Sequence, residues 1–183
     1  MQVKQASRPG SAIVKLRLPA SLVNIDSWGT VKMTANQYVV FILDAQRYAL
    51  HLAAVDRVVR MVHITLLSKA PDIVLGIVNM QGRVIPVINV RRRFRLPERE
   101  IALTDQLVIA HTARRVVALA VDTVMDVVEC SEQDLIAAES ILPAVEYLGG
   151  VVKLDGGLIL VHNLEKFLSL EEENSLDRAL ETS

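Results

Sequence analysis

The side chains that could carry chemistry are few and far apart. The four histidines are His51, His63, His111 and His162, and none stands three to five residues from another. Zinc pairs on a helix need that spacing, and the single cysteine, Cys130, excludes thiolate clusters and an intrachain disulfide. We therefore expect no metal site, histidines at the surface or rim of the fold, and Cys130 as a small, partly buried apolar residue.

Carboxylates occur in two groups that could serve as acid–base pairs. Asp122 and Asp126 would share one face of a continuous strand, and residues 171–173, all Glu, would begin a helix, where acids interact favourably with the helix dipole. The sequence contains no glycine-rich phosphate loop and no nucleophile elbow. We therefore expect a protein that is not an enzyme and uses no cofactor. A small all-β enzyme or ligand carrier is the alternative, and it would need a deep polar pocket.

The strongest local charge is a basic run of Arg91, Arg92, Arg93 and Arg95 around Phe94. A nucleic-acid patch would interleave such residues with aromatics, and the net charge of −1 offers no general attraction to polyanions. We predict a solvated helix face with Phe94 packed inward, and no nucleic-acid partner. A nucleic-acid-binding barrel that uses this run together with the basic N-terminal tail is the alternative, which strong salt dependence of DNA retention would support.

The chain gives no sign of a membrane or export route. No apolar run approaches the roughly 20 residues of a membrane span, and residues 1–10 lack the charged start and apolar stretch of a signal peptide. A lone cysteine does not point to an oxidising compartment. We expect a cytoplasmic protein without direct membrane insertion.

The elements that would hold these residues are mostly strands. Hydrophobic residues make up 51% of the chain and aromatics only 4%, a Val-rich composition typical of sheets with aliphatic packing. Strands are predicted at 38–43, 47–51, 58–62, 76–80, 83–88, 107–111, 116–121, 124–129, 148–154 and 158–162. The unbroken apolar run at 38–43 predicts a strand buried on both faces. Short helical turns are predicted after Leu52, Ser131 and Asn163, and a capping box of Ser169 with Glu172 predicts a C-terminal helix.

An internal repeat organises these strands. The stretch GIVNMQGRVIPVINVRRRF (76–94) aligns without gaps to GVVKLDGGLILVHNLEKFL (150–168), so that each copy reads strand, glycine turn, strand, asparagine and short helix. A weaker similarity matches positions 37, 39, 55, 58 and 59 with positions 106, 108, 124, 127 and 128. Two copies of one β unit are the economical interpretation, each closed into a barrel that leaves no free edges. Chance similarity between Val-rich strands is the alternative.

The repeat sets the expected domain organisation. Residues 1–36 form an N-terminal extension, flexible or loosely docked, with a strand pattern at 14–18 and five basic residues against one acid. The alternative for this extension is an extra partner-binding strand or a basic tether. Residues 37–168 form the main domain, with lobe one at about 37–94 and lobe two at about 106–168, and residues 169–183 form a C-terminal helix and tail.

Four stretches, in order along the chain, resemble the CheW-type domain family. GIVNMQGRVIPVINVRRRF is similar to the family signature, which reads roughly G-hydrophobic-N-L-R-G-x-x-x-P-hydrophobic-hydrophobic-D-L-R-x-x-F. YVVFILDAQRYAL, VVALAVDTVMDVVE and YLGGVVKLDGGLILVHNLEKFL also match the family's pattern, so that the resemblance covers residues 37 to about 170. It implies an all-β fold with short helices: two SH3-like five-stranded β-barrel lobes side by side plus a C-terminal helix.

The resemblance also implies a function. CheW-like proteins are non-catalytic adaptors in chemotaxis signal transduction. They couple the cytoplasmic tips of methyl-accepting chemoreceptors to the regulatory domain of the CheA-type histidine kinase, which is itself CheW-like. A receptor helix lies in the groove between the barrels, and the kinase contacts run barrel to barrel through aliphatic patches. Other CheW-like domains are further candidate partners, and the adaptor is recruited to membrane receptor arrays through its partners.

Carried over by position, the resemblance gives candidate residues for each partner. The receptor-binding groove would be lined by Val55, Arg57, Gln81, Leu107, Ala118 and Val127. Leu52 would lie on the kinase-binding patch. For Leu107, Ala118 and Val127 a place in the core is the alternative.

Two of these positions depart from the family pattern. Many relatives carry an acid where this chain has Arg57 and an arginine where it has Gln81, and those two can form an ion pair across the first barrel. Arg57 and Gln81 can share at most a hydrogen bond, so Arg57, with Arg83 close by, would place unpaired positive charge near the groove. We expect a partner helix that is more acidic than usual. The departure also leaves open an auxiliary CheW-like scaffold for another pathway, such as pilus-based motility, or one that binds only the kinase.

Overall fold

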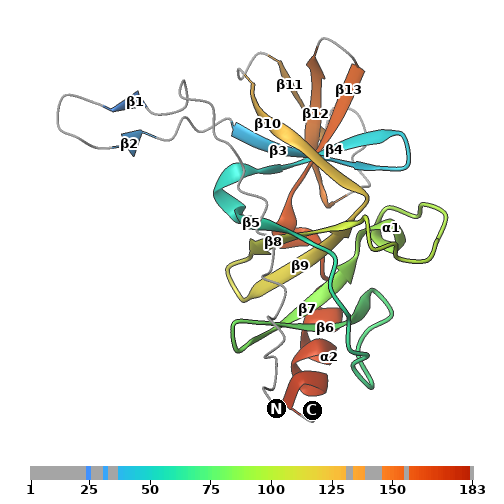
Figure 1. Cartoon of the computed structure of the whole chain (residues 1–183). Helices are drawn as coiled ribbons and strands as arrows, with labels where there is room; N and C mark the ends of the chain where they lie inside the picture. The colour runs from blue at the N-terminus through green and yellow to red at the C-terminus, as the bar shows by residue number, and fades with distance from the viewer. Residues whose placement is uncertain are drawn as a thin grey trace, which may run out of the picture.

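The computed structural model of the chain describes residues 24–25, 31–32, 37–130, 134–138, 146–154 and 157–181 (Figure 1). Of the N-terminal extension it describes only β1 (Asn24–Ile25) and β2 (Val31–Lys32), which pair antiparallel. The strand predicted at 14–18, the start of the helix predicted after Ser131 and the turn at 155–156 lie outside the described residues.

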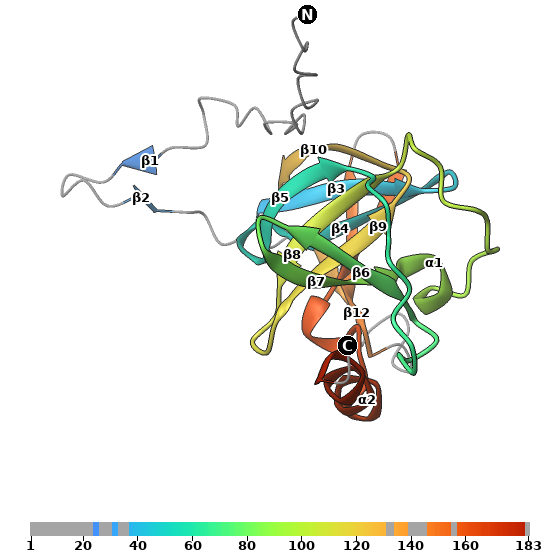
Figure 2. The same ribbon diagram turned by 60° about the horizontal axis from the view of Figure 1, so that its bottom comes forward.

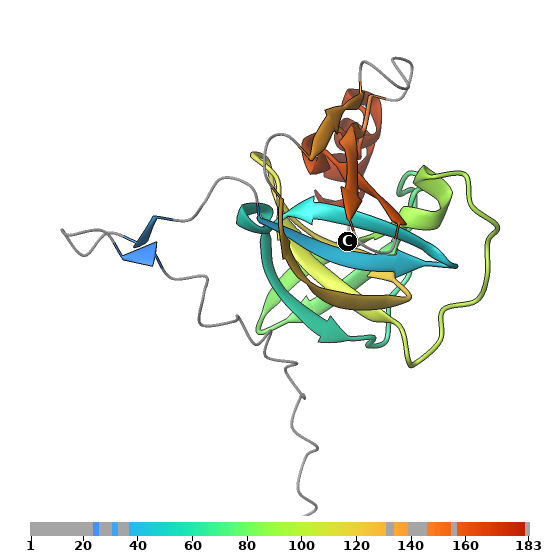
Figure 3. The same cartoon turned by 90° about the horizontal axis from the view of Figure 1, so that it is seen from above.

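The main domain consists of two sheets, one above the other in Figure 1. In side-by-side order, the strands of the upper sheet are β10 (Thr123–Glu129), β3 (Gln37–Leu43), β4 (Gln46–His51), β13 (Gly157–His162), β12 (Leu148–Leu154) and β11 (Leu135–Ala137). Those of the lower sheet are β5 (Val55–Arg60), β8 (Gln106–His111), β9 (Val116–Val121), β7 (Arg83–Asn89) and β6 (Val74–Met80). Figure 2 views the lower sheet from the front, and Figure 3 shows β10, β3 and β4 side by side from above. The all-β prediction is confirmed, with a sixth strand, β11, added to the upper barrel.

Each sheet takes strands from both copies of the repeat. In the upper sheet the β3–β4 hairpin of the first copy lies between β10 and the β12–β13 hairpin of the second. In the lower sheet the β8–β9 hairpin of the second copy lies between β5 and the β6–β7 hairpin of the first. The exchange creates two parallel pairings, β13 with β4 and β7 with β9, in otherwise antiparallel sheets. The expected lobes, 37–94 and 106–168, therefore differ from the barrels. A repeat predicts the order of strands along the chain, but it does not predict which sheet each hairpin joins.

The two copies share the same irregularities of pairing. The ladder of β5 with β8 shifts between Val55 and Arg57, and the ladder of β10 with β3 shifts between Val124 and Asp126. These positions match in the repeat. A bulge at the same place in both copies favours duplication over chance similarity, because Val-rich composition alone does not place bulges.

One hydrophobic cluster joins the two sheets. Its buried members come from both sheets and from the C-terminal segment, and include Phe41, Leu50, Val58, Leu119, Phe167 and Leu176. Two further clusters fill the barrels: one in the lower sheet includes Val59, Leu107 and Ala118, and one in the upper sheet includes Tyr38, Val40 and Ile159. Neighbouring residues thus alternate between the shared core and a barrel interior. This confirms the burial of β3 on both faces and explains its unbroken apolar run.

The C-terminal helix α2 (Leu170–Glu181) begins at the predicted capping box. The Ser169 N–H donates to Glu172 Oε2 at 2.7 Å, and the Glu172 N–H donates to Ser169 Oγ at 3.2 Å. Leu176 is fully buried in the shared core, and Leu180 packs against it. The helix therefore docks through a narrow apolar stripe formed by residues four apart.

Three short helices are anchored by polar side chains. Asn89 and Asn163, equivalent in the repeat, cap α1 (Val90–Arg93) and η4 (Leu164–Lys166) by accepting hydrogen bonds from backbone N–H groups. His51 caps η2 (Leu52–Ala54) in the same way through Nδ1. The helix predicted after Ser131 is wrong in its described part, because residues 135–137 extend to satisfy the edge of β12 as strand β11. None of the described helices is long and apolar enough to cross a bilayer.

Candidate functional site

The two sheets end at equivalent strands of the repeat, β5 and β10. Gln106 joins them at one end: it pairs with Arg60 of β5, and its Oε1 accepts a hydrogen bond of 2.6 Å from the Val124 N–H of β10. At the other end β5 follows η2, which lies against β3, and the last residues of β10 pair with the start of β3. The strands therefore pass each other in opposite directions. We call the outward side chains of Val55–Arg60 and Thr123–Glu129 the β5–β10 face.

Several sequence-predicted site residues lie on or beside this face. Val55 and Arg57 are half-buried on β5, and Val127 is half-buried on β10. Leu52, proposed for the kinase, is half-buried in η2 directly before β5. Partly exposed aliphatic side chains at a sheet edge are accessible to a partner without any change in the fold.

Two other candidates need correction. Leu107 and Ala118 are 0% exposed and pack inside the lower barrel. They have no surface to offer a receptor helix, so their assignment to the groove is wrong and the core alternative holds. Gln81 is exposed in the β6–β7 turn, with a φ of 57°, and no hydrogen bond or ion pair joins it to Arg57 within the described parts of the chain.

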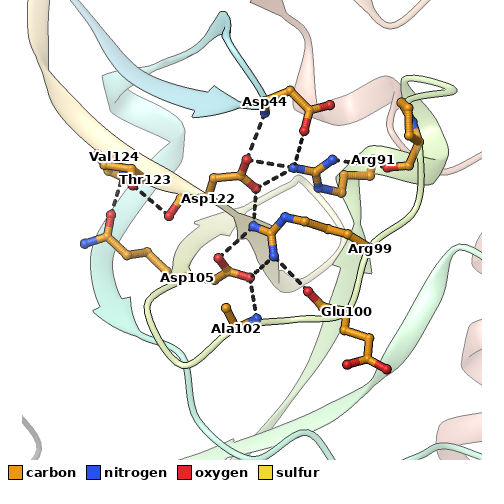
Figure 4. A network of polar contacts seen from close by, with 11 residues as sticks. Asp44, Arg91, Arg99, Glu100, Ala102, Asp105, Asp122, Thr123 and Val124 are labelled. Carbon is orange, nitrogen blue, oxygen red and sulfur yellow. Dashed lines mark hydrogen bonds and ion pairs between the residues drawn. The ribbon is translucent and has the colours of Figure 1, made fainter.

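A polar network lies between the sheets (Figure 4). The Asp122 carboxylate accepts hydrogen bonds from Arg91 at 2.7 Å, from Arg99 at 2.6 Å and from the Asp44 N–H at 2.8 Å. Arg99 also forms two hydrogen bonds with Asp105. Burial alone would raise the pKa of Asp122, but these donors hold it below its ordinary value. The network fastens the β3–β4 turn to the β9–β10 connection, and its carboxylates are occupied by structural contacts.

The arginine run contributes to this packing rather than to a solvated face. Arg91 is buried in the network, and Arg93 donates to Glu172 of α2 at 2.6 Å. The predicted solvated face is therefore wrong for Arg91 and Arg93, whose partners are distant in sequence. Phe94 packs inward as predicted, stacking on Tyr48 and on His162 with ring centroids 4.8 and 4.1 Å apart.

His162 departs from the expected surface location. It is 6% exposed within an aromatic cluster, and its Nδ1–H donates to the Tyr147 carbonyl at 3.1 Å. Burial lowers the pKa of His162 to about 4, against the opposite influence of that hydrogen bond. The ring is neutral at pH 7 and acts as a core aromatic. A histidine at the end of an apolar strand is the one sequence signal that could have indicated this.

A cavity of about 260 Å³ opens beside β3, β4 and β13. Polar side chains that line it accept hydrogen bonds from the backbone: His51 from the Ala53 N–H, Asn163 from the Glu165 N–H, and Glu165 from the Ala113 N–H. Across the described residues, no group of three or more His, Cys, Asp or Glu is placed to hold a metal ion. The polar side chains at this cavity are thus engaged with the backbone of the domain.

Two interleaved SH3-like barrels with a shared core and a docked C-terminal helix define an all-β two-barrel module. The family described as CheW-like domain matches residues 37–172, and the chain belongs to this family. It is 25% identical over 143 residues to the chemotaxis protein CheW of Klebsiella aerogenes, covering 77% of this chain and 86% of that protein. It is 26% identical over 141 residues to the chemotaxis protein CheW of Rhizobium meliloti, covering 76% and 91%.

A solved structure supports the same relationship. The scaffolding protein TtCheW from Thermoanaerobacter tengcongensis superposes with a TM-score of 0.70 at 26% identity, covering 76% of this chain and 96% of that one. The family resemblance and the two-barrel fold that the sequence predicted are both confirmed.

Proposed function

We propose that the chain is a non-catalytic, cytoplasmic adaptor that couples chemoreceptors to a CheA-type histidine kinase. The observation that carries the proposal is the β5–β10 face: two accessible edge strands with half-buried valines in a CheW-like two-barrel domain. An adaptor needs surfaces rather than reactive groups. The polar residues that could have suggested chemistry instead form caps, ion pairs and core contacts.

Each partner would use a different part of the surface. Val55 and Val127 offer aliphatic area to a receptor helix from two sides of the β5–β10 face. Leu52 in η2 lies at the end of that face and is the candidate contact for the kinase regulatory domain. A stable interface buries about 800 Å² per partner, so each contact needs neighbouring strand residues as well. Separate surfaces would let both partners bind one adaptor at once.

The proposal is tested by measuring affinity for each partner separately. Val127→Lys is expected to weaken binding of a purified chemoreceptor tip fragment by at least about tenfold, because it places a charge in an apolar contact. Leu52→Lys is expected to weaken binding of the CheA regulatory domain and to spare the receptor fragment. Leu158→Lys is the matched control, since Leu158 is 55% exposed on β13, away from both sites.

Three outcomes are distinguishable in titration calorimetry. Binding of both partners by the unmodified chain, with selective loss in the variants, supports the adaptor. Binding of the kinase domain alone would favour the auxiliary scaffold instead. Failure to bind either partner at concentrations up to about 100 times a micromolar Kd would contradict the proposal.

A further inference from the structure

The two strands of the β5–β10 face are equivalent in the repeat but opposite in charge. The repeat matches Val55 with Val124, Val58 with Val127 and Arg57 with Asp126. Arg57 lies at the bulge of β5, and Asp126 lies at the equivalent bulge of β10. β5 also ends in Arg60 and β10 in Glu129, which follow three residues later and point to the other side of their strands. One strand therefore carries excess positive charge and the other excess negative charge.

These charges are not neutralised within the described parts of the chain. Neither Arg57 nor Arg60 forms a hydrogen bond or ion pair with a described side chain. The Asp56 carboxylate, which could have compensated them, lies 2.8 Å from His111 Nδ1. On β10, Asp126 accepts a hydrogen bond only from the neighbouring Val127 N–H in the contacts described.

Glu129 receives a neutral donor rather than a cation. Its Oε1 accepts a hydrogen bond of 2.9 Å from Gln37 Nε2. The negative charge of β10 thus remains available to a partner, as does the positive charge of β5. A face with one basic and one acidic side adds a negative strand to the unpaired positive charge of Arg57 that the sequence alone predicted.

The consequence follows from the symmetry of the face. The two strands pass in opposite directions and present Val55 and Val124, which are equivalent in the repeat and both half-buried, whereas Val58 is buried in the shared core. A helix lying between the strands could therefore contact this pair of valines in either of two opposite directions. Reversing the helix exchanges the flanks that lie over β5 and β10. Opposite charges on those strands make the two directions unequal in energy.

We propose that the β5–β10 face selects one direction of its partner helix. The partner is an amphipathic helix with carboxylates on the flank over Arg57, and lysine or arginine on the flank over Asp126. This inference rests on the proposed function, since it takes the receptor tip helix as the occupant. It adds the charge pattern of that helix and the orientation in which it lies.

The first test uses charge reversal with a purified chemoreceptor tip fragment as the probe. Arg57→Glu and Asp126→Arg are each expected to weaken binding by roughly 3- to 10-fold at low salt, with a smaller effect at 0.5 M salt. Both side chains lie at a sheet edge, so the variants are expected to retain the fold, which far-UV circular dichroism checks. Lys153→Glu is the matched control, because Lys153 is exposed on β12, which three other strands separate from β10 in the upper sheet.

The second test reads the direction itself. A photo-crosslinking residue replaces Met125, which is 52% exposed near the start of β10, and the two ends of the probe helix carry different mass tags. The unmodified charges are expected to direct crosslinking to one end, and the Arg57→Glu, Asp126→Arg double variant to the other. Equal crosslinking to both ends, or binding unchanged by either single reversal, overturns the inference and leaves the adaptor function standing. A chain that does not bind the probe at all overturns both.

Discussion

The buried histidine makes the stability of this domain depend on pH between about 4 and 6.5. His162 is neutral in the folded protein because burial lowers its pKa to about 4, whereas an unfolded histidine has a pKa of 6.5. The unfolded chain therefore binds the proton more readily. Stability is fully present above pH 6.5 and is lost as the pH falls toward 4.

The size of the effect follows from the two pKa values. Each pKa difference of one corresponds to 1.36 kcal/mol, so the gap between 6.5 and about 4 corresponds to roughly 3 kcal/mol of unfolding free energy. Most of that loss falls between pH 6.5 and 4.5. Asp122 and Glu172, whose pKa values are also lowered, add to the loss mainly at more acidic pH.

The test compares urea unfolding of the unmodified chain and His162→Phe from pH 7.5 to 4.5. Phenylalanine keeps the stack on Phe94 and removes the titrating group, while the lost hydrogen bond to Tyr147 costs about 1 kcal/mol at every pH. We expect the stability of the variant to change less across this range than that of the unmodified chain. The exposed His63 supplies the control, His63→Asn, which should follow the unmodified chain. Parallel curves for the unmodified chain and His162→Phe would refute the reasoning.

Three further predictions concern stability, each with a control measured by thermal and urea unfolding. Asp122→Asn should destabilise the domain by roughly 1–3 kcal/mol, because Arg91 keeps only the half-exposed Asp44 as a charged partner, whereas Glu98→Gln at an exposed ion pair should change little. Gly76→Ala should be severely destabilising, since a Cβ there would lie 2.2 Å from the Thr65 carbonyl oxygen at a φ of +146°, whereas Gly82→Ala in open space should cost only about 1 kcal/mol of backbone strain. Leu176→Ala should lower the free energy of unfolding by about 2–5 kcal/mol and Leu170→Ala should leave it almost unchanged, because Leu176 is 0% and Leu170 72% exposed. Equal effects of the two variants in any of these three pairs would contradict the packing described.

Much of the fold could be predicted from local sequence signals. Strands buried on both faces leave unbroken apolar runs, and the caps at Asn163 and Ser169 bond to backbone groups only a few residues away. The exchange of hairpins could not be predicted in the same way. The β3–β4 and β8–β9 hairpins are equivalent in the repeat and could form the same strand pairings in either sheet. Which sheet each hairpin joins therefore depends on packing across the shared core.

The site was harder to predict because a strand buried on both faces is apolar throughout. Its sequence therefore does not distinguish core residues from residues that contact a partner. Leu107 and Ala118 are apolar strand residues like Val127, and only the position of their strands within the sheets separates them. Arg91 shows the same difficulty for charge. Its carboxylate partners lie 47 and 31 residues away along the chain. The sequence alone therefore suggests a solvated run of arginines, because it does not show that the fold places these acids beside Arg91.

Co-sedimentation tests the adaptor account most directly. Receptor-containing vesicles and the CheA-type kinase are mixed with increasing amounts of this chain, and the kinase in the pellet is measured. An adaptor with two separate surfaces predicts that pelleted kinase rises with the chain and falls again at large excess, when each partner is saturated by a different copy. Kinase that stays in the supernatant at every concentration of the chain would contradict the account.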